Sequence, residues 1–235
     1  MSLDLEAVKK FYRGQKKVWP DNNEYYAHSR KEICRFINDN KFRNNDVILN
    51  LGSGGNDYDL KNIMHHVDIV DTHISKFPLY TVAGIENLPF SDSKFINIIC
   101  VGSVLNYSNA MESISEISRV AKIGCNFIVE FECSSGFEYL MKPYFCQDAT
   151  IATLEYCNES HIEWLYSENY IMKILKENSF SVNKKHRFHY ISSLLCGFIK
   201  NENLSGRAAK LDAAIRHIPI LKKFAGNIIL YCQKN

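Results

Sequence analysis

The chain has 235 residues, of which 46% are hydrophobic and 23% charged, and its formal net charge is +2. This length favours one domain with a sizeable core, and the composition is ordinary for a globular protein. So small a net charge gives no reason to expect a nucleic-acid or membrane partner, and no apolar run reaches the roughly 20 residues that a membrane helix needs.

The eight cysteines form no C-x₂-C or C-x₃-C pair, so we expect no zinc ribbon, no iron–sulfur site and no metal. Several stand in apolar runs, which is typical of reduced thiols in a core. The first six residues are Met-Ser-Leu-Asp-Leu-Glu, which lack the apolar segment of a signal peptide. These features predict a cytoplasmic protein.

Two helices are predicted ahead of the first strand, over residues 3–17 and 24–40, with a proline- and asparagine-rich break at 19–23. In the second, Ile33, Phe36 and Ile37 fall at helical spacing. Either the aromatic and polar side chains here pack the helices on a sheet, or they cover a binding site. They are Tyr12, Trp19, Tyr25, Tyr26, His28 and Arg30.

The most informative segment is 47–56, where an apolar run, Val47 to Leu51, leads directly into a turn with Gly52, Gly54 and Gly55. Glycine has no Cβ and tolerates positive φ, so backbone N–H groups in such a turn can approach a polar ligand. The spacing matches neither G-x-G-x-x-G nor G-x-x-x-x-G-K-[ST]. It suits a nucleoside joined to an amino acid; the alternative is that the glycines serve only the turn.

A second strand is predicted over Val67–Asp71, so that Asp71 follows the glycines by about twenty residues. A carboxylate there can accept hydrogen bonds from ribose hydroxyls, and the alternative is a plain turn aspartate. Further along, the pattern predicts a strand over 96–103, a helix over 110–121 that stops at Lys122-Ile123-Gly124, and a strand over 126–131.

In this order the segments resemble the class I S-adenosylmethionine (SAM)-dependent methyltransferases. The resemblance covers roughly residues 45–132 and rests on the segments Leu49–Gly55, Val70-Asp71, Glu86–Phe90, Ser103–Tyr107 and Glu116–Gly124. It implies an α/β fold: a Rossmann-like, seven-stranded, mostly parallel sheet with an antiparallel C-terminal strand and helices on both faces.

The resemblance also implies that residues 1–235 form a single domain. Its parts are an N-terminal helical lid (1–44), a SAM-binding core (45–132), a helical insertion on the substrate side (133–170), and a C-terminal helix and strands (171–235). More loosely, Trp164–Glu168 and Leu175–Phe180 resemble the last helix and its entry into the sixth strand, and Asn227–Gln233 the closing strand. One more amphipathic helix, over 205–224 and ending near Pro219, is expected between the last two strands.

SAM is the cofactor that the resemblance implies. It places the cofactor on Asn50, Leu51, Gly52, Ser53, Gly54, Asp71, Thr72, Ile85, Glu86, Gly102 and Ser103. Two positions depart from the family's pattern. Asn50 stands where an acidic residue is usual, and Gly84 stands where many members carry an aspartate that reaches the adenine amino group.

Methyl transfer needs a nucleophile in line with the S–CH₃ bond, and a base only if the acceptor is protonated. Candidates for a base are Tyr107, His161 and His28. Aromatic residues of 133–170 either wall a pocket or form the core of a helical cap. The residues expected to contact a substrate are Tyr12, Trp19, Tyr25, Tyr26, Asn106, Tyr107, His161 and Trp164.

The segment 103–107 lacks the Asn/Asp-Pro-Pro-Tyr/Phe sequence of exocyclic-amine DNA methyltransferases, and the chain has no Pro-Cys nucleophile. We therefore expect a small-molecule acceptor, such as a metabolite, a natural-product intermediate or a sugar derivative. An oligomer is compatible with the sequence but is not predicted. Two alternatives stay open. The basic residues Lys184, Lys185 and Arg187, with those after 206, favour RNA or protein as acceptor, whereas Asn50 and Gly84 favour a silent binding or scaffold protein.

Overall fold

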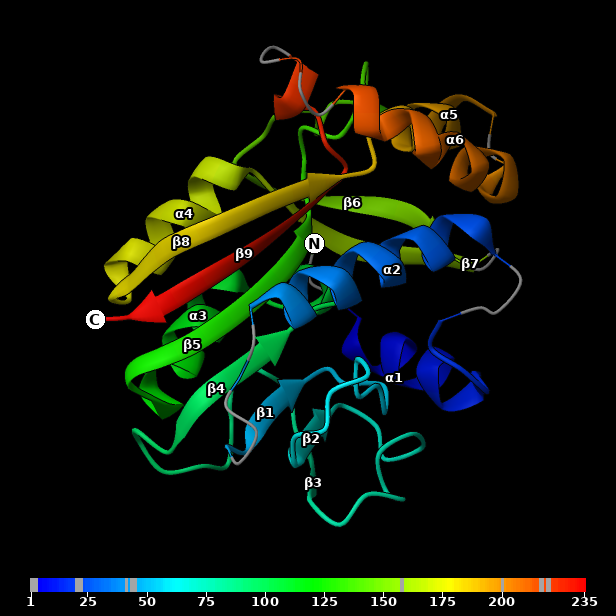
Figure 1. The fold of residues 1–235 in the computed structure, drawn as a ribbon. Coiled ribbons are helices and arrows are strands. Elements are labelled where there is room, and N and C mark those ends of the chain that lie inside the picture. Colours follow the sequence, from blue (N-terminus) through cyan, green and yellow to red (C-terminus); the bar gives the residue numbers. More distant parts are fainter. Residues whose placement is uncertain are drawn as a thin grey trace.

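The computed structural model describes residues 4–19, 23–40, 42, 46–156, 159–199, 201–215, 218 and 221–235 (Figure 1). Seven strands form one sheet in the order β3-β2-β1-β4-β5-β9-β8. The pairs among β1 to β5 are parallel, and β9 is antiparallel to both β5 and β8. This confirms the predicted sheet. The strands are β1 (Ile48–Leu51), β2 (Met64–Asp68), β3 (Tyr80–Val82), β4 (Phe95–Cys100), β5 (Ala121–Glu132), β8 (Phe180–Phe188) and β9 (Asn227–Lys234).

Helices cover both faces of the sheet (Figure 1). On one face α2 (Glu24–Asp39) packs Ile33, Phe36 and Ile37 against the sheet, which confirms the spacing seen in the sequence. On the other face α3 (Ala110–Val120) and α4 (Glu168–Glu177) pack against the opposite side chains of the same strands. The remaining helices are α1 (Leu5–Gly14), α5 (Ile191–Ile199) and α6 (Glu202–Ile215), with the 3₁₀ turns η1 (Val104–Tyr107), η2 (Phe137–Tyr139) and η3 (Leu221–Lys223).

The insertion after β5 is a β-hairpin, so the prediction of a helical insertion is wrong. Its strands, β6 (Ala149–Tyr156) and β7 (Glu159–Tyr166), pair antiparallel outside the main sheet. β-Branched and aromatic residues stand at every second position of β7, at Ile162, Trp164 and Tyr166, which favours a pleated, half-buried surface. The helix suggested by the resemblance from about Trp164 is α4, which begins only at Glu168, where the Oγ of Ser167 accepts a hydrogen bond from the N–H of Tyr170 at 3.1 Å.

Three boundaries also differ from the prediction. β2 runs from Met64 to Asp68, three residues earlier than the strand expected over 67–71. β5 begins at Ala121, directly after α3, so Gly124 lies inside a strand with a φ of 78°. In place of the helix expected over 205–224 the structure has α6 and η3. Together with α5, they lie between β8 and β9 in the sequence. The end expected for that helix, near Pro219, lies outside the described residues.

Arg119, at the end of α3, holds the loop that follows β3. Its guanidinium donates to the carboxylates of Glu116 and Asp92 at 2.7 and 2.6 Å. It also donates to the carbonyl oxygens of Leu88 and Phe90 at 3.0 and 2.7 Å. The segments Glu86–Phe90 and Glu116–Gly124, on which the family resemblance partly rested, are therefore joined in space.

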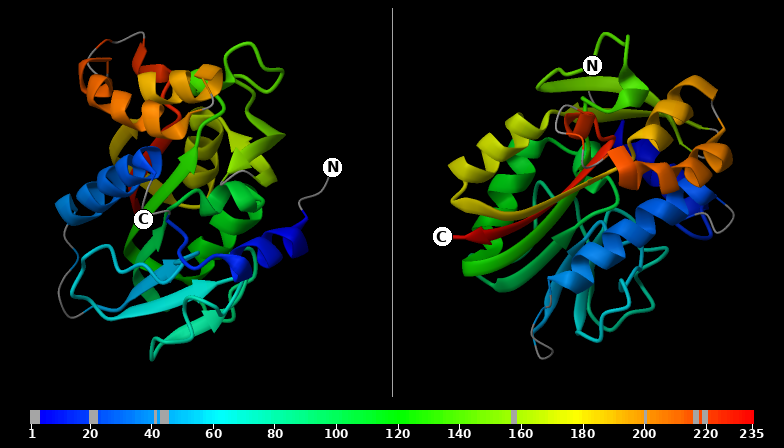
Figure 2. Two further views of the ribbon diagram at one scale, coloured as in Figure 1. Left: turned by 90° about the vertical axis from the view of Figure 1, so that its right-hand side faces the viewer. Right: turned by 45° about the horizontal axis from the view of Figure 1, so that its top comes forward.

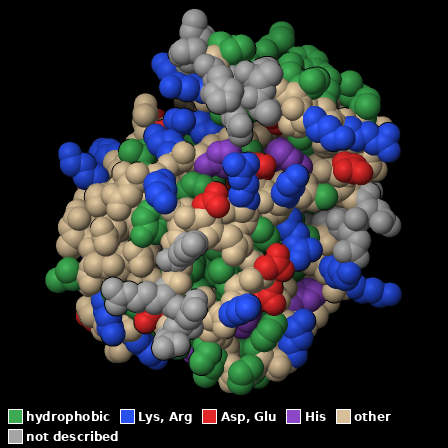
Figure 3. Space-filling view, in the orientation of Figure 1, with side chains coloured by type: hydrophobic (Ala, Val, Ile, Leu, Met, Phe, Trp, Pro, Cys, Tyr) green, Lys and Arg blue, Asp and Glu red, His purple; other side chains and the backbone are tan. Residues whose placement is uncertain are grey.

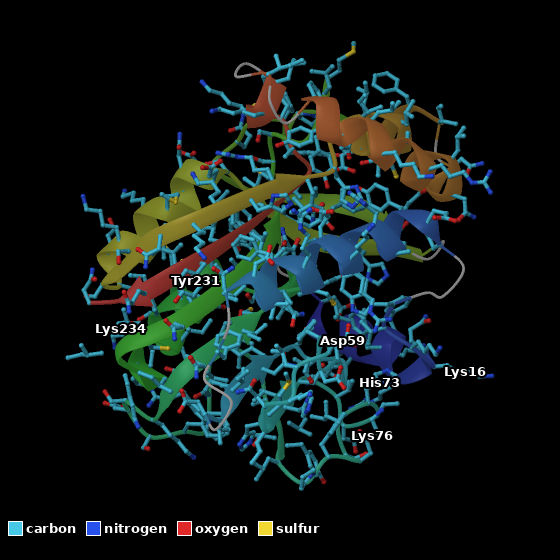
Figure 4. All side chains as sticks on the ribbon, viewed as in Figure 1. Lys16, Asp59, His73, Lys76, Tyr231 and Lys234 are labelled. Carbon is cyan, nitrogen blue, oxygen red and sulfur yellow. The ribbon has the colours of Figure 1, made fainter. Side chains whose placement is uncertain are left out.

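The closing strand is tied to the same end of α3. Lys234, labelled in Figure 4, donates from Nζ to the carbonyl oxygens of Ser118 and Ala121 at 2.6 and 3.0 Å. Of the cysteines, Cys100, Cys125, Cys133 and Cys232 are buried, as predicted for core thiols, whereas Cys146 is exposed and Cys157 lies outside the described residues. None of the described helices is long and apolar enough to cross a membrane.

Tyr166 provides a test of how η1 and α3 are anchored. Its buried hydroxyl donates to the carbonyl of Ser108 at 2.6 Å and accepts from the N–H of Ala110 at 3.1 Å. Tyr166→Phe leaves both backbone groups without this partner. We therefore expect it to lower the free energy of unfolding by about 2–4 kcal/mol in urea denaturation. The control, Tyr170→Phe, keeps the ring that stacks on Tyr166. Equal losses in the two variants would contradict the assigned role.

Candidate functional site

The glycine turn after β1 has the conformation that its sequence predicts. Gly52, Gly54 and Gly55 have φ values of 59°, 50° and 75°, which disfavour any residue with a Cβ. Space is restricted as well. A Cβ on Gly52 would lie 2.2 Å from Cγ2 of Val104, and one on Gly54 would lie 2.6 Å from Cγ2 of Val18. The turn is therefore in close contact with both η1 and the segment that follows α1.

A narrow pocket lies over this turn, and we call it the glycine-turn pocket. Its volume is about 70 Å³ because α1 and Val18 lie across its outer side. His73, labelled in Figure 4, is one of its lining residues. The pocket is lined on the sheet side by Gly52, Gly54, Asp68, Ile69, Val70, His73, Ala83, Gly84, Ile85, Glu86, Gly102, Val104, Tyr107 and Ser108, and on the outer side by Leu5, Val8, Tyr12 and Val18.

The residues predicted to bind the cofactor fall into three groups. Those that line the glycine-turn pocket are Gly52, Gly54, Ile85, Glu86 and Gly102, and Ser103 lines the cavity beside it. Those buried behind the turn are Asn50, Leu51 and Ser53, each at most 1% exposed. Asp71 and Thr72 are exposed and do not belong to the described lining of the pocket.

Asn50 supports the turn from behind. Its amide Nδ2 donates to the carbonyl of Asn56 at 2.8 Å, and its Oδ1 is buried with no hydrogen-bond partner among the described residues. Asn50, which stands where the family usually has an acidic residue, therefore uses its side chain to hold the glycine turn.

The carboxylate at the end of β2 is Asp68, so the prediction that Asp71 ends this strand is wrong. The two histidines before Val67 hid the true strand in the sequence. In the structure His66 is 2% exposed and stacks on Phe77 at 3.8 Å, so it behaves as a core residue. Asp68 Oδ2 accepts the N–H of Gly54 at 2.8 Å, and the carboxylate also accepts the N–H groups of Ile69 and Val70. Burial raises the pKa of Asp68, and these three donors oppose the rise.

A cavity of about 750 Å³ adjoins the glycine-turn pocket. The two share Tyr12, Val18, Gly102 and Tyr107 as lining residues. Figures 1 and 2 show α1, the hairpin and α5–α6 on the same side of the sheet, beyond the carboxyl ends of β4 and β5. Ligands of open α/β sheets bind at this edge. Residues of α1, α2, η1, β5, η2, the hairpin and α5 all contribute to the wall.

Five glutamates line this cavity. Glu155 is exposed, and the four inner ones are Glu130, Glu132, Glu138 and Glu163. We call this space the acidic cavity. Glu130 and Glu163 are only 1% and 4% exposed. Glu132 and Glu138 keep surface that lines the cavity. Among the described lining residues the single basic side chain is Lys142, which is exposed.

Each of the four inner carboxylates accepts hydrogen bonds from neutral donors. Glu130 accepts from the N–H groups of Gly102 and Ser103, both at 2.8 Å, and from Nδ2 of Asn227 at 2.7 Å. For the other three the donors are phenols and a hydroxyl. Glu132 is bonded by Tyr139 at 3.0 Å and by Ser103 Oγ at 3.2 Å, Glu138 by Tyr25, and Glu163 by Tyr107.

Burial in a shared space disfavours the charged forms. It raises the pKa of Glu130 to about 7 and that of Glu163 to about 8, and the negative charge of Glu132 adds to both shifts. The pKa values of Glu132 and Glu138 are raised for the same first reason, loss of solvation. Several carboxylates thus share one cavity, and its described lining holds no buried cationic side chain to balance them.

The predicted substrate residues are brought together only in part. Those that line the acidic cavity are Tyr12, Trp19, Tyr25, Tyr26 and Tyr107. His161 lies behind the wall, with its ring 4.4 Å from that of Phe11 and 6.2 Å from that of Tyr107. Residues 161, 163 and 165 share one face of β7, and Trp164 stacks on Tyr166 on the opposite face, away from the cavity.

Asn106 has a structural position instead of the predicted contact with substrate. Its Nδ2 donates to the carbonyls of Glu132 and Trp164 at 3.1 and 2.7 Å, and its Oδ1 accepts the N–H of Glu132 at 2.9 Å. It is fully buried, and it joins η1 to β5 and β7.

His28 lies in a separate cluster with His189 and Asp212, whose ligand-type atoms are all within 4.8 Å of one another. Both ring nitrogens of His189 are engaged, by Ser29 Oγ at 2.7 Å and Ser192 Oγ at 2.8 Å. Asp212 accepts from the hydroxyl of Ser192 at 2.6 Å. These bonds tie α2 to α5 and α6, on the far side of Tyr25 from the cavity, since the Tyr25 ring stacks on His189 at 3.8 Å.

Sequence reasoning missed Asp68 and the four inner glutamates of the acidic cavity. One signal was available. Glu130 lies near the end of the strand predicted over 126–131 and Glu132 directly follows it, and residues two apart on one strand point to the same face of the sheet. Glu138 and Glu163 carried no comparable signal, since they reach the cavity through η2 and the hairpin.

No protein-family model and no curated protein matches the chain. Solved structures match it along nearly its whole length. One is 1,6-didemethyltoxoflavin-N1-methyltransferase of Burkholderia thailandensis, solved with bound 1,6-didemethyltoxoflavin and S-adenosylhomocysteine (SAH) (TM-score 0.56, 10% identity, 99% of this chain and 86% of that one). Another is geranyl diphosphate C-methyltransferase of Streptomyces coelicolor, solved with Mg²⁺, geranyl diphosphate and SAH (TM-score 0.58, 10% identity, 98% of each chain).

A third match is the [4+2]-cyclase SpnF (TM-score 0.60, 13% identity, 100% of this chain and 97% of that one). The protein therefore has the fold of the class I SAM-dependent methyltransferases, as its sequence predicted. At such identities the likeness concerns the fold, and the function has to be argued from the site.

The buried glutamates make stability depend on pH. Since the folded-state pKa of Glu163 is about 8 against an ordinary 4.5, the folded protein binds more protons than the unfolded chain between these values. Stability is therefore greatest near the lower value and falls as the pH rises toward about 8. We expect the loss of Tm over this range to be smaller in Glu163→Gln than in wild type. Glu177→Gln, at an exposed position of α4, is the control. An unchanged pH profile in Glu163→Gln would refute the shift.

Proposed function

We propose that the protein transfers the methyl group of SAM to a small molecule held in the acidic cavity. The observation that carries this proposal is the junction of the two spaces at Gly102 and Tyr107. A cofactor on the glycine turn would there face an acceptor in the cavity, at the carboxyl ends of β1 and β4, where ligands of this architecture bind.

The residues around the glycine-turn pocket fit SAM in their chemistry. The turn offers backbone without Cβ atoms, and Asp68 offers a carboxylate for the ribose hydroxyls in the role first expected of Asp71. Ile85 and Glu86, in the loop that Arg119 holds, line the pocket and would contact the adenine. Gly84 leaves that side of the pocket open, since a Cβ there would meet only Glu86 Oε2, at 3.6 Å.

The present volume of about 70 Å³ is too small for a whole nucleoside, because drug-sized ligands occupy pockets of about 300–1,000 Å³. Leu5, Val8, Tyr12 and Val18 form the outer wall. We infer that α1 and the segment up to Trp19 move outward when the cofactor enters and close over it afterwards. This is the lid role that the sequence predicted for the N-terminal helices.

The sulfonium of SAM supplies an electrophilic methyl group, so the protein's work is to position the acceptor and exclude water. Alignment of two reactants accounts for about 7–11 kcal/mol of barrier lowering in the best intramolecular models. Here Tyr12 and Tyr107 would border the acceptor at the junction, and Val18 and Trp19 would cover it. Tyr107 and Glu163 would hold or accept a proton.

The basic cluster near the C-terminus gives little support to a nucleic-acid substrate. Arg187 pairs with Glu168 at 2.5 Å, Lys185 pairs with the same carboxylate, and Lys184 Nζ lies 5.7 Å from the centre of the Tyr231 ring. Figure 3 shows Lys and Arg side chains scattered over the visible face, with Asp and Glu between them. Arg216 lies outside the described residues.

The cofactor site is tested by isothermal titration with SAH. We expect micromolar binding by wild type and binding weaker by about 10- to 100-fold in Asp68→Asn, since a charge-assisted hydrogen bond contributes about 1.5–3 kcal/mol. Asp71→Asn, three residues further on and exposed, is the matched control and should bind like wild type. Loss in Asp71→Asn with none in Asp68→Asn would restore the first placement of the ribose. Failure of wild type to bind SAH would refute the proposed function.

The acceptor class is tested by incubating the protein with methyl-labelled SAM and an extract of cells, separated into small-molecule and macromolecular fractions. Label is expected in the small-molecule fraction and absent from a reaction with Asp68→Asn. Label confined to RNA or protein would instead support the macromolecular alternative. SAH binding without any transfer would favour a silent relative, or a different reaction on the same fold.

A further inference from the structure

The acidic cavity has an imbalance of charge that methyl transfer alone does not explain. The described lining holds five glutamates, including Glu155 at the rim, against the single exposed Lys142. A buried carboxylate is costly unless it is paired or protonated. Phenols and amides satisfy hydrogen bonds here, but they do not neutralise charge. A cavity built in this way is complementary to a ligand that brings positive charge with it.

We propose that the acidic cavity binds a small organic cation, with a protonated amine lying among Glu132, Glu138 and Glu163. This inference rests on the proposed function, because it names the acceptor class for that same site. The three carboxylates reach the space from β5, η2 and β7, and each is oriented by a hydroxyl: Tyr139 and Ser103 on Glu132, Tyr25 on Glu138 and Tyr107 on Glu163. An ammonium group carries up to three N–H donors, so it can bond directly to one of these carboxylates and use its other donors on neighbouring oxygens of the wall.

The spacing of the carboxylates favours an organic cation over a metal ion. Ligands of one Mg²⁺ or Ca²⁺ lie about 2.0–2.6 Å from the ion, so their oxygens lie within about 5 Å of one another. In the part of the chain that the structure describes, the cavity glutamates form no group of three whose oxygens all lie within 4.8 Å. A protonated amine needs no such group of three, because it bonds directly to one carboxylate at about 2.8 Å while the charges of the others attract it across the cavity.

The remainder of the wall suits the body of such a ligand. The volume of about 750 Å³ holds a molecule of drug size. Tyr12, Tyr25, Tyr107 and Tyr139 present aromatic rings, which attract cations over their faces and also stack on planar groups. Asn23, Asn201 and Asn203 add amides for hydroxyl groups. A hydroxylated or aromatic amine fits this lining better than a hydrocarbon.

The position of Glu163 links the cation to transfer. Its partner Tyr107 also lines the glycine-turn pocket, so an amine bonded to Glu163 lies at the junction with the cofactor site. A protonated amine has no free electron pair, and Glu163 is placed to accept the proton that must leave before the nitrogen can take a methyl group. The raised pKa of this carboxyl, about 8, makes it a better base than an ordinary carboxylate.

The first experiment compares matched probes that differ in charge, by isothermal titration in the presence of SAH. One set is tyramine, tyrosol and 4-hydroxyphenylacetate; the other is glucosamine, glucose and glucuronate. Within at least one set we expect the amine to bind about tenfold or more tightly than its neutral and anionic analogues. Equal binding within both sets, preference for an anion, or no binding of either amine would overturn the proposal.

The second experiment uses Glu138→Gln and Glu163→Gln, which keep the size of each side chain and remove its charge. Both are expected to weaken binding of the preferred amine about 10- to 100-fold and to leave binding of its neutral analogue unchanged. The control, Glu177→Gln, changes an exposed glutamate on α4 and should bind the amine like wild type.

Thermal denaturation without ligand separates a binding role from a structural one. Removing an unbalanced buried charge should raise the Tm of Glu138→Gln and Glu163→Gln above that of wild type near pH 8, while amine binding falls. A lower Tm together with unchanged amine selectivity would mean that the glutamates only support the fold, and would overturn the proposal.

The proposal can fail separately from the proposed function. If SAH still binds but neither probe set shows a preference for the amine, the cation proposal is wrong and the proposed methyltransferase function is unaffected. Failure to bind SAH would refute the proposed methyltransferase function. Amine selectivity measured without SAH would then show whether the cavity is still a cation site.

Discussion

A single buried carboxylate, Glu130, holds together the parts of the molecule on which both candidate sites depend. Its oxygens accept the N–H groups of Gly102 and Ser103, which follow β4, and the amide of Asn227, which begins β9. These bonds join three neighbouring strands, β4, β5 and β9, at the end of the sheet where β4 and β5 finish and β9 begins. Without this bond network the backbone at Gly102, where the two spaces meet, would have buried N–H groups with no acceptor.

The acidic cavity, which lies beyond the carboxyl ends of β4 and β5, is therefore polar and carries negative charge that its described lining does not balance. In a low-dielectric cavity hydrogen bonds are strong, but unpaired charges are correspondingly unfavourable. Glu132, Glu138 and Glu163 line the same cavity, and the charge of Glu132 raises the pKa values of Glu138 and Glu163. Residues that reduce stability in the empty protein are typical of functional sites, where a ligand restores the balance. The acidic cavity is consistent with that rule. The apolar packing of α2, α3 and α4 on the sheet supplies the stability that the buried glutamates reduce.

Two segments that resembled family motifs in the sequence, Glu86–Phe90 and Leu49–Gly55, contain residues that fix the backbone of the loops around the glycine-turn pocket. Glu86–Phe90 is held by Arg119 through the carbonyls of Leu88 and Phe90, and Glu116 accepts the N–H of Leu88 at 2.7 Å. Ile85 and Glu86 are presented to the glycine-turn pocket because the rest of their loop is fixed in this way. Asn50 similarly holds Asn56, at the other side of the turn. The pattern was thus informative about loop geometry as well as about ligand contacts.

The local chemistry of the chain determined the apolar β1 strand, the positive-φ glycine turn that follows it, the amphipathic faces of α2 and α3, and through their order the seven-stranded sheet. These features depend on neighbouring residues, so they can be read along the sequence. Tertiary structure decided the rest. The end of β2 is set by its pairing with β1, in which Leu51 lies opposite Val67, and this makes Asp68 the terminal carboxylate despite the two polar histidines before it. The acidic cavity needs β5, η2 and the hairpin to meet, and contacts between residues as distant as Glu132 and Glu163 leave no periodic signal, because each carboxylate is placed by the packing of its own element.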